Sequence, residues 1–116
     1  MNSKDIALKI AKILDDKKGL DIFIIDIATK SSFADYFILA SGANERQIGA
    51  LANEVEDELA KDELLVKNIE GKKESGWILM DYGDIIVNVL TVEMRERYHI
   101  EKVWGDCDTV PTGLEG

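Results

Sequence analysis

The amino-acid sequence predicts a layered α/β domain in which helices flank a mixed β-sheet. Two stretches place apolar residues at helical spacing, and several short runs are rich in Ile, Val and Phe. The two kinds of segment alternate along the chain, and helices distributed between strands are typical of a sheet that helices cover. The predicted order of elements is α-β-β-α-β-β-β-α.

The first predicted helix covers residues 3–18 and ends at Gly19, with Ser3 placed to cap its start. Its apolar face consists of Ile6, Ile10, Ile13 and Leu14. The run LDIFIIDIA, residues 20–28, predicts a strand that is apolar on both faces, so we expect it to be central in the sheet. The run DYFILASG, residues 35–42, predicts a second strand.

The most regular helix is predicted from Asn44 to about Lys61. Asn44 and Gln47 resemble a capping box at its start. Its apolar stripe comprises Ile48, Leu51, Ala52, Val55 and Leu59. The segment LLVKNIEG, residues 64–71, then predicts a short third strand.

The last part of the chain predicts a hairpin followed by a helix. GWILMDY and DIIVNVLTV form the hairpin around Gly83, and residues 93–104 form the helix, which Trp104 packs onto the sheet. The segment after it is small, polar and aperiodic, so we expect it to be loosely ordered. The expected organisation is one domain, residues 1–104, and a C-terminal tail, residues 105–116.

The composition describes a single domain with an ample core. The chain has 116 residues, of which 46% are hydrophobic. No apolar run approaches the roughly 20 residues that span a bilayer, and the N-terminal residues lack the order of a signal peptide. Cys107 is the only cysteine, which excludes an internal disulfide and provides no spaced set of metal ligands. We therefore expect a cytoplasmic protein without membrane association.

The charge balance bears on the class of partner. The chain carries 14 basic and 23 acidic residues, a net charge of −9. Nucleic acids are bound through Lys and Arg that neutralise phosphates, so we expect little or no direct nucleic-acid contact. An acidic protein is attracted instead to basic protein surfaces. The same charge also fits a surface that only keeps the protein soluble.

One pattern raises the hypothesis of a metal-dependent nucleotidyltransferase. Ser41 and Gly42 lie between a predicted strand and a helix, where backbone N–H groups suit phosphate. Asp81 and Asp84 could hold Mg²⁺ for phosphoryl transfer. However, these acids lie on either side of the Gly83 turn and lack the D-x-D spacing of that enzyme class. The pattern therefore favours a helix entry and a hairpin turn over an active site.

The hairpin itself has the composition of a binding surface. In an alternating strand, Trp77, Leu79 and Asp81 share one face, and a Trp beside an Asp indicates a half-exposed surface. Aromatic residues and Met are typical anchors of protein interfaces. The pattern alone leaves packing and binding equally open for Trp77.

Three long stretches carry a resemblance that no single motif provides. They are SSFADYFILASGANERQIGALANEVEDEL, GWILMDYGDIIVNVL and RERYHIEKVWGD. In this order and spacing they closely resemble the Iojap-like family, the ribosomal silencing factors, over about residues 3–106. The resemblance implies a nucleotidyltransferase-like fold without the catalytic acids, and hence a protein that is not an enzyme and needs no cofactor.

The resemblance also implies a function. Members of the family bind the large ribosomal subunit through ribosomal protein number fourteen, a small basic protein. From there they block joining of the small subunit and repress translation. Organellar relatives act in assembly of the large subunit, so a ribosome assembly factor is an alternative. A plain interaction module with another target is a further one.

The predicted partner-binding site is the hairpin region. It consists of Trp77, Leu79, Met80, Asp81, Tyr82 and Asp84. The positions that match the family's characteristic residues are Asp35, Tyr36, Ser41, Gly42, Arg46, Gln47, Trp77, Asp81, Gly83, Asp84, Tyr98, Glu101 and Trp104. The chain departs from the family at Asn88, where His is usual, and at Leu90 and Arg97, where an aromatic residue is common. An aromatic hairpin without its partner can also self-associate, so a homodimer of the free protein is a further expectation.

Overall fold

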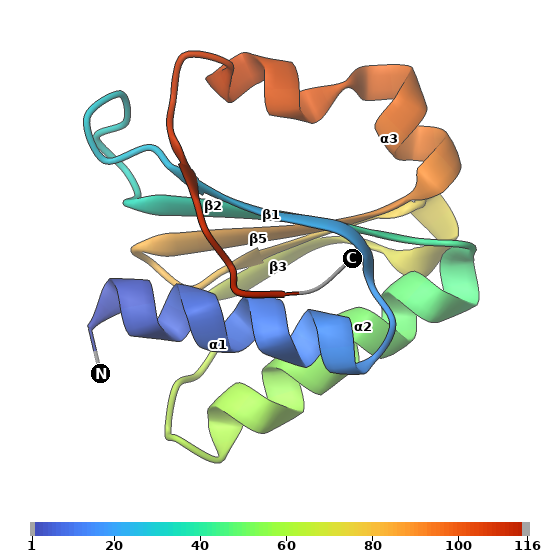
Figure 1. The fold of residues 1–116 in the computed structure, drawn as a ribbon. Coiled ribbons are helices and arrows are strands. Elements are labelled where there is room, and N and C mark those ends of the chain that lie inside the picture. Colours follow the sequence, from blue (N-terminus) through green and yellow to red (C-terminus); the bar gives the residue numbers. More distant parts are fainter. Residues whose placement is uncertain (1, 115–116) are drawn as a thin grey trace.

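The computed structural model describes residues 2–114, apart from the side chain of Glu101, as one sheet with helices on both faces (Figure 1). The elements are α1 (Ser3–Asp16), β1 (Leu20–Asp26), β2 (Tyr36–Gly42), α2 (Glu45–Ala60), β3 (Asn68–Lys72), η1 (Lys73–Ser75), β4 (Trp77–Asp81), β5 (Ile85–Thr91), α3 (Val92–Tyr98), η2 (Ile100–Trp104) and β6 (Thr109–Val110). The predicted order of helices and strands is confirmed. The 3₁₀ helices η1 and η2 and the strand β6 are additions to it.

The sheet is mixed, as predicted, with the strand order β3-β4-β5-β2-β1-β6. β2 and β5 are parallel, and every other neighbouring pair is antiparallel. β5 is buried along its whole length. The expected central position of β1 is wrong, because β1 lies beside the edge strand β6 and its first residues are exposed. An apolar strand has the same composition at the centre of a sheet and next to its edge, so only strand pairing decides the position of β1.

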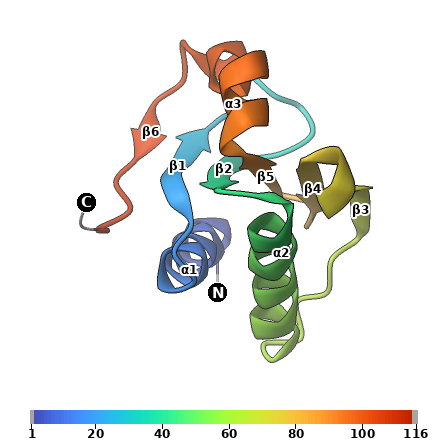
Figure 2. The same ribbon diagram turned by 90° about the vertical axis from the view of Figure 1, so that its right-hand side faces the viewer.

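α1 and α2 pack side by side on one face of the sheet (Figure 2). All five residues of the predicted α2 stripe are buried. They join the apolar face of α1 and residues of the central strands in the larger of two core clusters. Amphipathic spacing therefore predicted correctly which side of α2 faces the sheet.

The two long helices begin at Asn residues. Asn2 caps α1, since its Oδ1 accepts a hydrogen bond from the Asp5 amide at 2.9 Å, so the cap is not Ser3 as expected. In α2, Asn44 Oδ1 accepts from the Gln47 amide at 2.9 Å, which confirms the predicted cap.

Within residues 2–114, no helix combines the length and the apolar character needed to cross a bilayer.

The opposite face of the sheet is covered by shorter elements. The helix predicted over residues 93–104 is interrupted at His99, whose φ of 45° lies in the left-handed region, and the chain continues as η2. Trp104 packs against Phe37 with ring centroids 5.9 Å apart, as predicted. α3 lies over β5 and β2. The β3–β4 side of this face is consequently less covered, and every residue of β3 is exposed.

The segment after η2 differs from the expected loosely ordered tail. Thr109 and Val110 pair with β1, and the Asp26 amide donates to the Asp108 carbonyl at 2.9 Å. Leu114 packs against the α1–α2 side of the core. The reason is that β1 leaves one edge unpaired, and even an aperiodic segment can satisfy that edge with its backbone. Residues 115–116 of the predicted tail lie outside the described residues.

Candidate partner-binding surface

β4 divides its side chains between the two faces of the sheet. Ile78 and Met80 are buried in the α1–α2 core, whereas Trp77 and Leu79 are half-buried and pack on the α3 side. Asp81 follows them on the α3 side by alternation. α3 covers this strand only in part, so the apolar side chains Trp77 and Leu79 remain partly open to solvent. We call the α3-side face of β3 and β4 the open face.

Trp77 is held in place by two contacts. Its indole Nε1–H donates a hydrogen bond to Asn88 Oδ1 at 2.9 Å. Its ring packs against Tyr98 of α3, with centroids 5.9 Å apart and planes inclined at 45°. Tyr98 itself is 54% exposed. The two rings therefore form one aromatic pair, in which Trp77 lies on the sheet and Tyr98 is open to solvent.

A shallow groove of about 340 Å³ lies next to this aromatic pair. It is lined by Glu70, Gly71, Ser75, Trp77, Leu79 and Met94. The register pairs Glu70 with Leu79 and Lys72 with Trp77, so β3 adds one acidic and one basic side chain to the same face. The groove offers a mostly apolar floor with a carboxylate at its rim.

Gly71 allows the two strands that form the groove to approach. Its φ is +77°, a conformation that favours glycine. A Cβ at this position would overlap the carbonyl oxygen of Trp77. The β3–β4 ribbon and the position of Trp77 therefore depend on a glycine here.

The six predicted site residues do not share one surface. Trp77, Leu79 and Asp81 lie on the open face. Met80 is fully buried, so its assignment to a binding surface is wrong, because the pleat turns it into the core. Tyr82 packs against the same core, on the side of α1 and α2.

Asp84 lies away from the open face as well. Its Oδ2 accepts a hydrogen bond from Ser3 Oγ at 3.3 Å, at the start of α1. It also borders a pocket that Tyr82 and Ile6 line. The hairpin turn thus separates Asp84 from Trp77, although the two residues are close in sequence.

Asp81 holds the turn of the hairpin. Its Oδ1 accepts a hydrogen bond from the Gly83 amide at 2.7 Å, and Gly83 has a φ of +92°. This is the Asx-turn arrangement that Asp favours. A carboxylate has further acceptor positions, so Asp81 can combine this structural role with a partly exposed carboxylate.

The parts of the hypothetical metal-dependent enzyme are not brought together. Asp81 pairs with Ile86, which pairs with Phe37, whereas Ser41 lies four residues further along β2. That separation is roughly 13 Å along the strand. Ser41 is buried, and its Oγ accepts from Arg95 Nη1 at 2.9 Å. No three His, Cys, Asp or Glu side chains among the described residues are placed to hold a metal ion.

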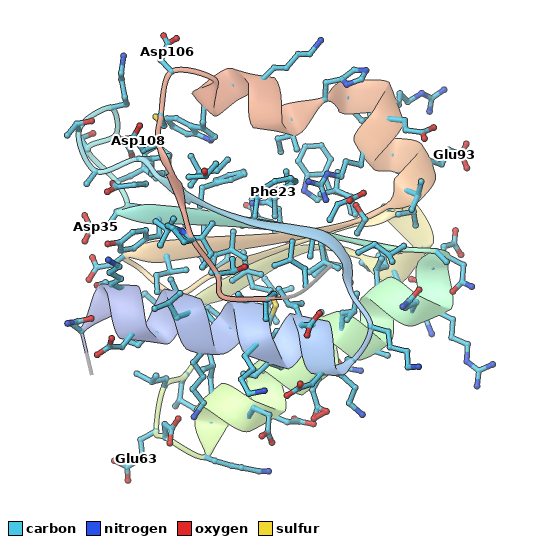
Figure 3. All side chains as sticks on the ribbon, in the orientation of Figure 1. Phe23, Asp35, Glu63, Glu93, Asp106 and Asp108 are labelled. Atoms are coloured by element: carbon cyan, nitrogen blue, oxygen red, sulfur yellow. The ribbon has the colours of Figure 1, made fainter. Side chains whose placement is uncertain are left out.

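Sequence reasoning missed three residues: two that line the groove on the open face, and one that fastens α3 to β1 and β2. Glu70 and Met94 line the groove, and the buried Arg95 joins α3 to the sheet by donating to the Asp21 carbonyl at 2.6 Å. Arg95 also lies over the Phe23 ring, which points from β1 toward α3 (Figure 3). Glu70 lies beside Leu79 because of the register between β3 and β4, which local sequence patterns do not give.

Comparisons with known proteins agree with the fold and with one another. The model of the family described as "Ribosomal silencing factor during starvation" matches residues 1–115. The ribosomal silencing factor RsfS of Bacillus subtilis is 39% identical over 107 residues, covering 92% of this chain and 91% of that protein. A crystal structure of a Chromobacterium violaceum protein superposes with a TM-score of 0.87 at 34% identity, covering 90% of this chain and 88% of that one.

An organellar protein is a more distant relative. The mouse protein named "Mitochondrial assembly of ribosomal large subunit protein 1" is 27% identical over 99 residues, which cover 82% of this chain and 43% of that protein. The names of these relatives assign them to ribosome silencing and to assembly of the large ribosomal subunit. The chain belongs to the family of ribosomal silencing factors.

Proposed function

We propose that this protein binds the large ribosomal subunit through ribosomal protein number fourteen and sterically blocks joining of the small subunit. The observation that carries the proposal is the open face, where Trp77 and the groove remain partly exposed beside Tyr98 of α3. Family membership supports the ribosome as the target, and the family resemblance supports the particular ribosomal protein.

The chemistry of the open face suits a basic protein partner. An apolar side chain of the partner would fill the groove. The carboxylate of Glu70 at its rim, and that of Asp81 further along β4, would attract Lys or Arg. Aromatic residues in such a position typically contribute most of the binding free energy. The remaining bulk of the domain would then occupy space that the small subunit needs.

Subunit joining provides the direct test. Purified small and large subunits are joined in Mg²⁺ with and without excess protein, and the products are separated by sedimentation in a sucrose gradient. We expect the protein to travel with the large-subunit peak while the peak of joined ribosomes shrinks. A protein that stays at the top of the gradient, with normal joining, would contradict the proposal.

Replacing Trp77 tests whether the open face is the contact. Trp77→Ala should weaken binding to the large subunit by about 2 kcal/mol or more, roughly thirtyfold, because the central aromatic anchor is lost. The matched control is Leu65→Ala, which truncates a side chain that is 73% exposed and lies away from the open face. Both variants are first checked for folding by circular dichroism. Equal binding by both would remove Trp77 from the interface.

Large-subunit assembly is a second candidate function, because the name of the mouse relative assigns it to assembly. The two functions differ in the particle that is bound. A silencing factor binds the mature large subunit, whereas an assembly factor associates with precursors and its loss makes them accumulate. Sedimentation profiles of cells that lack the protein distinguish these outcomes.

A further inference from the structure

Asn88 is a polar residue at the centre of the sheet. It lies in β5, is fully buried, and is paired with Leu79 on one side and Leu39 on the other. An amide in such apolar surroundings is unfavourable unless both its oxygen and its nitrogen form hydrogen bonds. The presence of Asn at this position therefore calls for a specific contact.

That contact is the hydrogen bond to Trp77. The indole Nε1–H can only donate, so the amide atom that faces it at 2.9 Å must be the Asn88 oxygen. The Asn88 Nδ2 group, on the other side of the amide, has no hydrogen-bond acceptor among the described residues. Of the two polar atoms of the amide, only the oxygen forms a hydrogen bond, and it does so with Trp77 on the open face.

We propose that Asn88 is a positioning residue that fixes the orientation of the Trp77 indole for docking of the partner. The proposal rests on the function proposed above. Trp77 is only half-buried beside Leu79, Met94 and Tyr98, and its hydrogen bond to Asn88 holds the polar edge of the ring as well. A side chain fixed before binding loses less conformational entropy when the partner arrives. Asn88 acts through Trp77 and needs no contact with the partner.

The main test replaces Asn88 by Leu, which has a similar volume but no hydrogen-bond acceptor. We expect the indole N–H resonance of Trp77 to move upfield and to exchange faster with solvent, because its acceptor is gone. Binding to the large subunit should weaken by about tenfold. The melting temperature should stay the same or rise, because an unpaired buried amide is removed as well. A loss of melting temperature in parallel with binding would point to a merely structural role and overturn the proposal.

A double-mutant cycle isolates the contact. Trp77→Phe keeps an aromatic ring but has no N–H, so in that background Asn88→Leu should cause no further loss of binding. Asn88→His, whose ring nitrogen can accept in place of the amide oxygen, should restore both the indole resonance and the affinity. An equal loss of binding by Asn88→Leu in both backgrounds would contradict the proposal.

Failure of the proposed function has a different signature. If the unmodified protein does not bind the large subunit, the silencing proposal fails, and the indole resonance alone decides the role of Asn88. An indole signal and exchange rate unchanged by Asn88→Leu would then overturn the positioning role, whereas a clear change would sustain it.

Discussion

Trp77 and Tyr82 belong to the same hairpin, but their polar atoms have different surroundings. The Trp77 N–H donates to Asn88, whereas the Tyr82 hydroxyl is buried without a hydrogen-bond partner among the described residues. Burial, and to a smaller extent the negative charge of Glu56, raises the pKa of Tyr82 to about 12. The difference follows from the pleat, which turns Tyr82 toward α1 and α2 and Trp77 toward α3.

Tyr82 should make the folded protein sensitive to alkaline pH. Its pKa is higher in the folded chain than the value of about 10 expected after unfolding, so between these values the unfolded chain binds fewer protons. The free energy of unfolding should therefore fall as pH rises from about 10 toward 12.

Tyr82→Phe is the variant that checks this. Melting temperatures are compared at about pH 9 and pH 11, and the variant should lose less stability than the unmodified protein. Tyr36, whose pKa is also raised by burial, remains in both proteins and cancels in the comparison. At neutral pH the variant should be as stable or slightly more stable, because a buried hydroxyl without a partner is removed. Identical pH dependence of the two proteins would contradict the assignment.

At the scale of the elements, the open face exists because α3 is short and the β3–β4 pair extends past it. α3 ends at Tyr98, and His99 turns the chain so that η2 lies over Phe37 instead of over β4. The β3–β4 ribbon extends past the cover that α3 provides. A longer, uninterrupted last helix could have covered Trp77, and the same residues would then form ordinary core.

Gly71 is the position where the ribbon is most sensitive. Gly71→Ala should destabilise the fold by about 2 kcal/mol or more, because φ is positive and the added Cβ would overlap the Trp77 carbonyl. Gly105→Ala is the matched control, since Gly105 has a φ of −59° and its Cβ would meet the Lys102 carbonyl only at 3.4 Å. Urea unfolding of both variants measures the difference. Equal stability would show that the ribbon adjusts without strain.

At the scale of the whole molecule, acidic residues are dispersed around the surface. Figure 3 labels Glu63, Glu93 and Asp106 at well separated points of the outline, and Asp35 and Asp108 on the same side as Asp106. The net charge of −9 therefore acts as a general field, and the open face with its apolar groove provides the specific contact. Direction of approach and final fit thus depend on different parts of the molecule.

The general field predicts a strong effect of salt on the rate of association. Between about 50 mM and 500 mM salt, the rate constant for binding the isolated basic ribosomal protein of the proposed function should fall roughly tenfold, because screening shortens the range of attraction. The dissociation rate should change less, since the groove is apolar. Stopped-flow measurements with a dye-labelled protein separate the two rates. An association rate that does not change with salt would rule out a basic partner surface.

The C-terminal segment should contribute to stability. A chain that ends at Gly105 lacks β6 and Leu114, and its melting temperature should fall by about 4–8 °C for each kcal/mol lost. As a matched pair in the intact chain, Val110→Ala should lower the melting temperature, and Thr109→Ala, an exposed neighbour, should not. An unchanged melting temperature of the shortened chain would restore the expectation of a loosely ordered tail.

The sequence by itself determined the features that depend on neighbouring residues. The stripe of α2, the Asn44 cap, the hairpin and the order of the elements were predicted, because helical spacing, side-chain capping and turn chemistry act over a few residues. The family was likewise recognisable from three stretches of sequence.

Only the tertiary structure decided which residues meet across the sheet. It placed Met80 in the core, turned Asp84 toward Ser3, moved β1 next to the edge and paired β6 with it. It also joined Trp77 to Asn88, which local patterns could not foresee. The physical reason is that strand register and the reach of α3 depend on contacts between distant parts of the chain. A binding surface consists of the residues that those contacts leave uncovered.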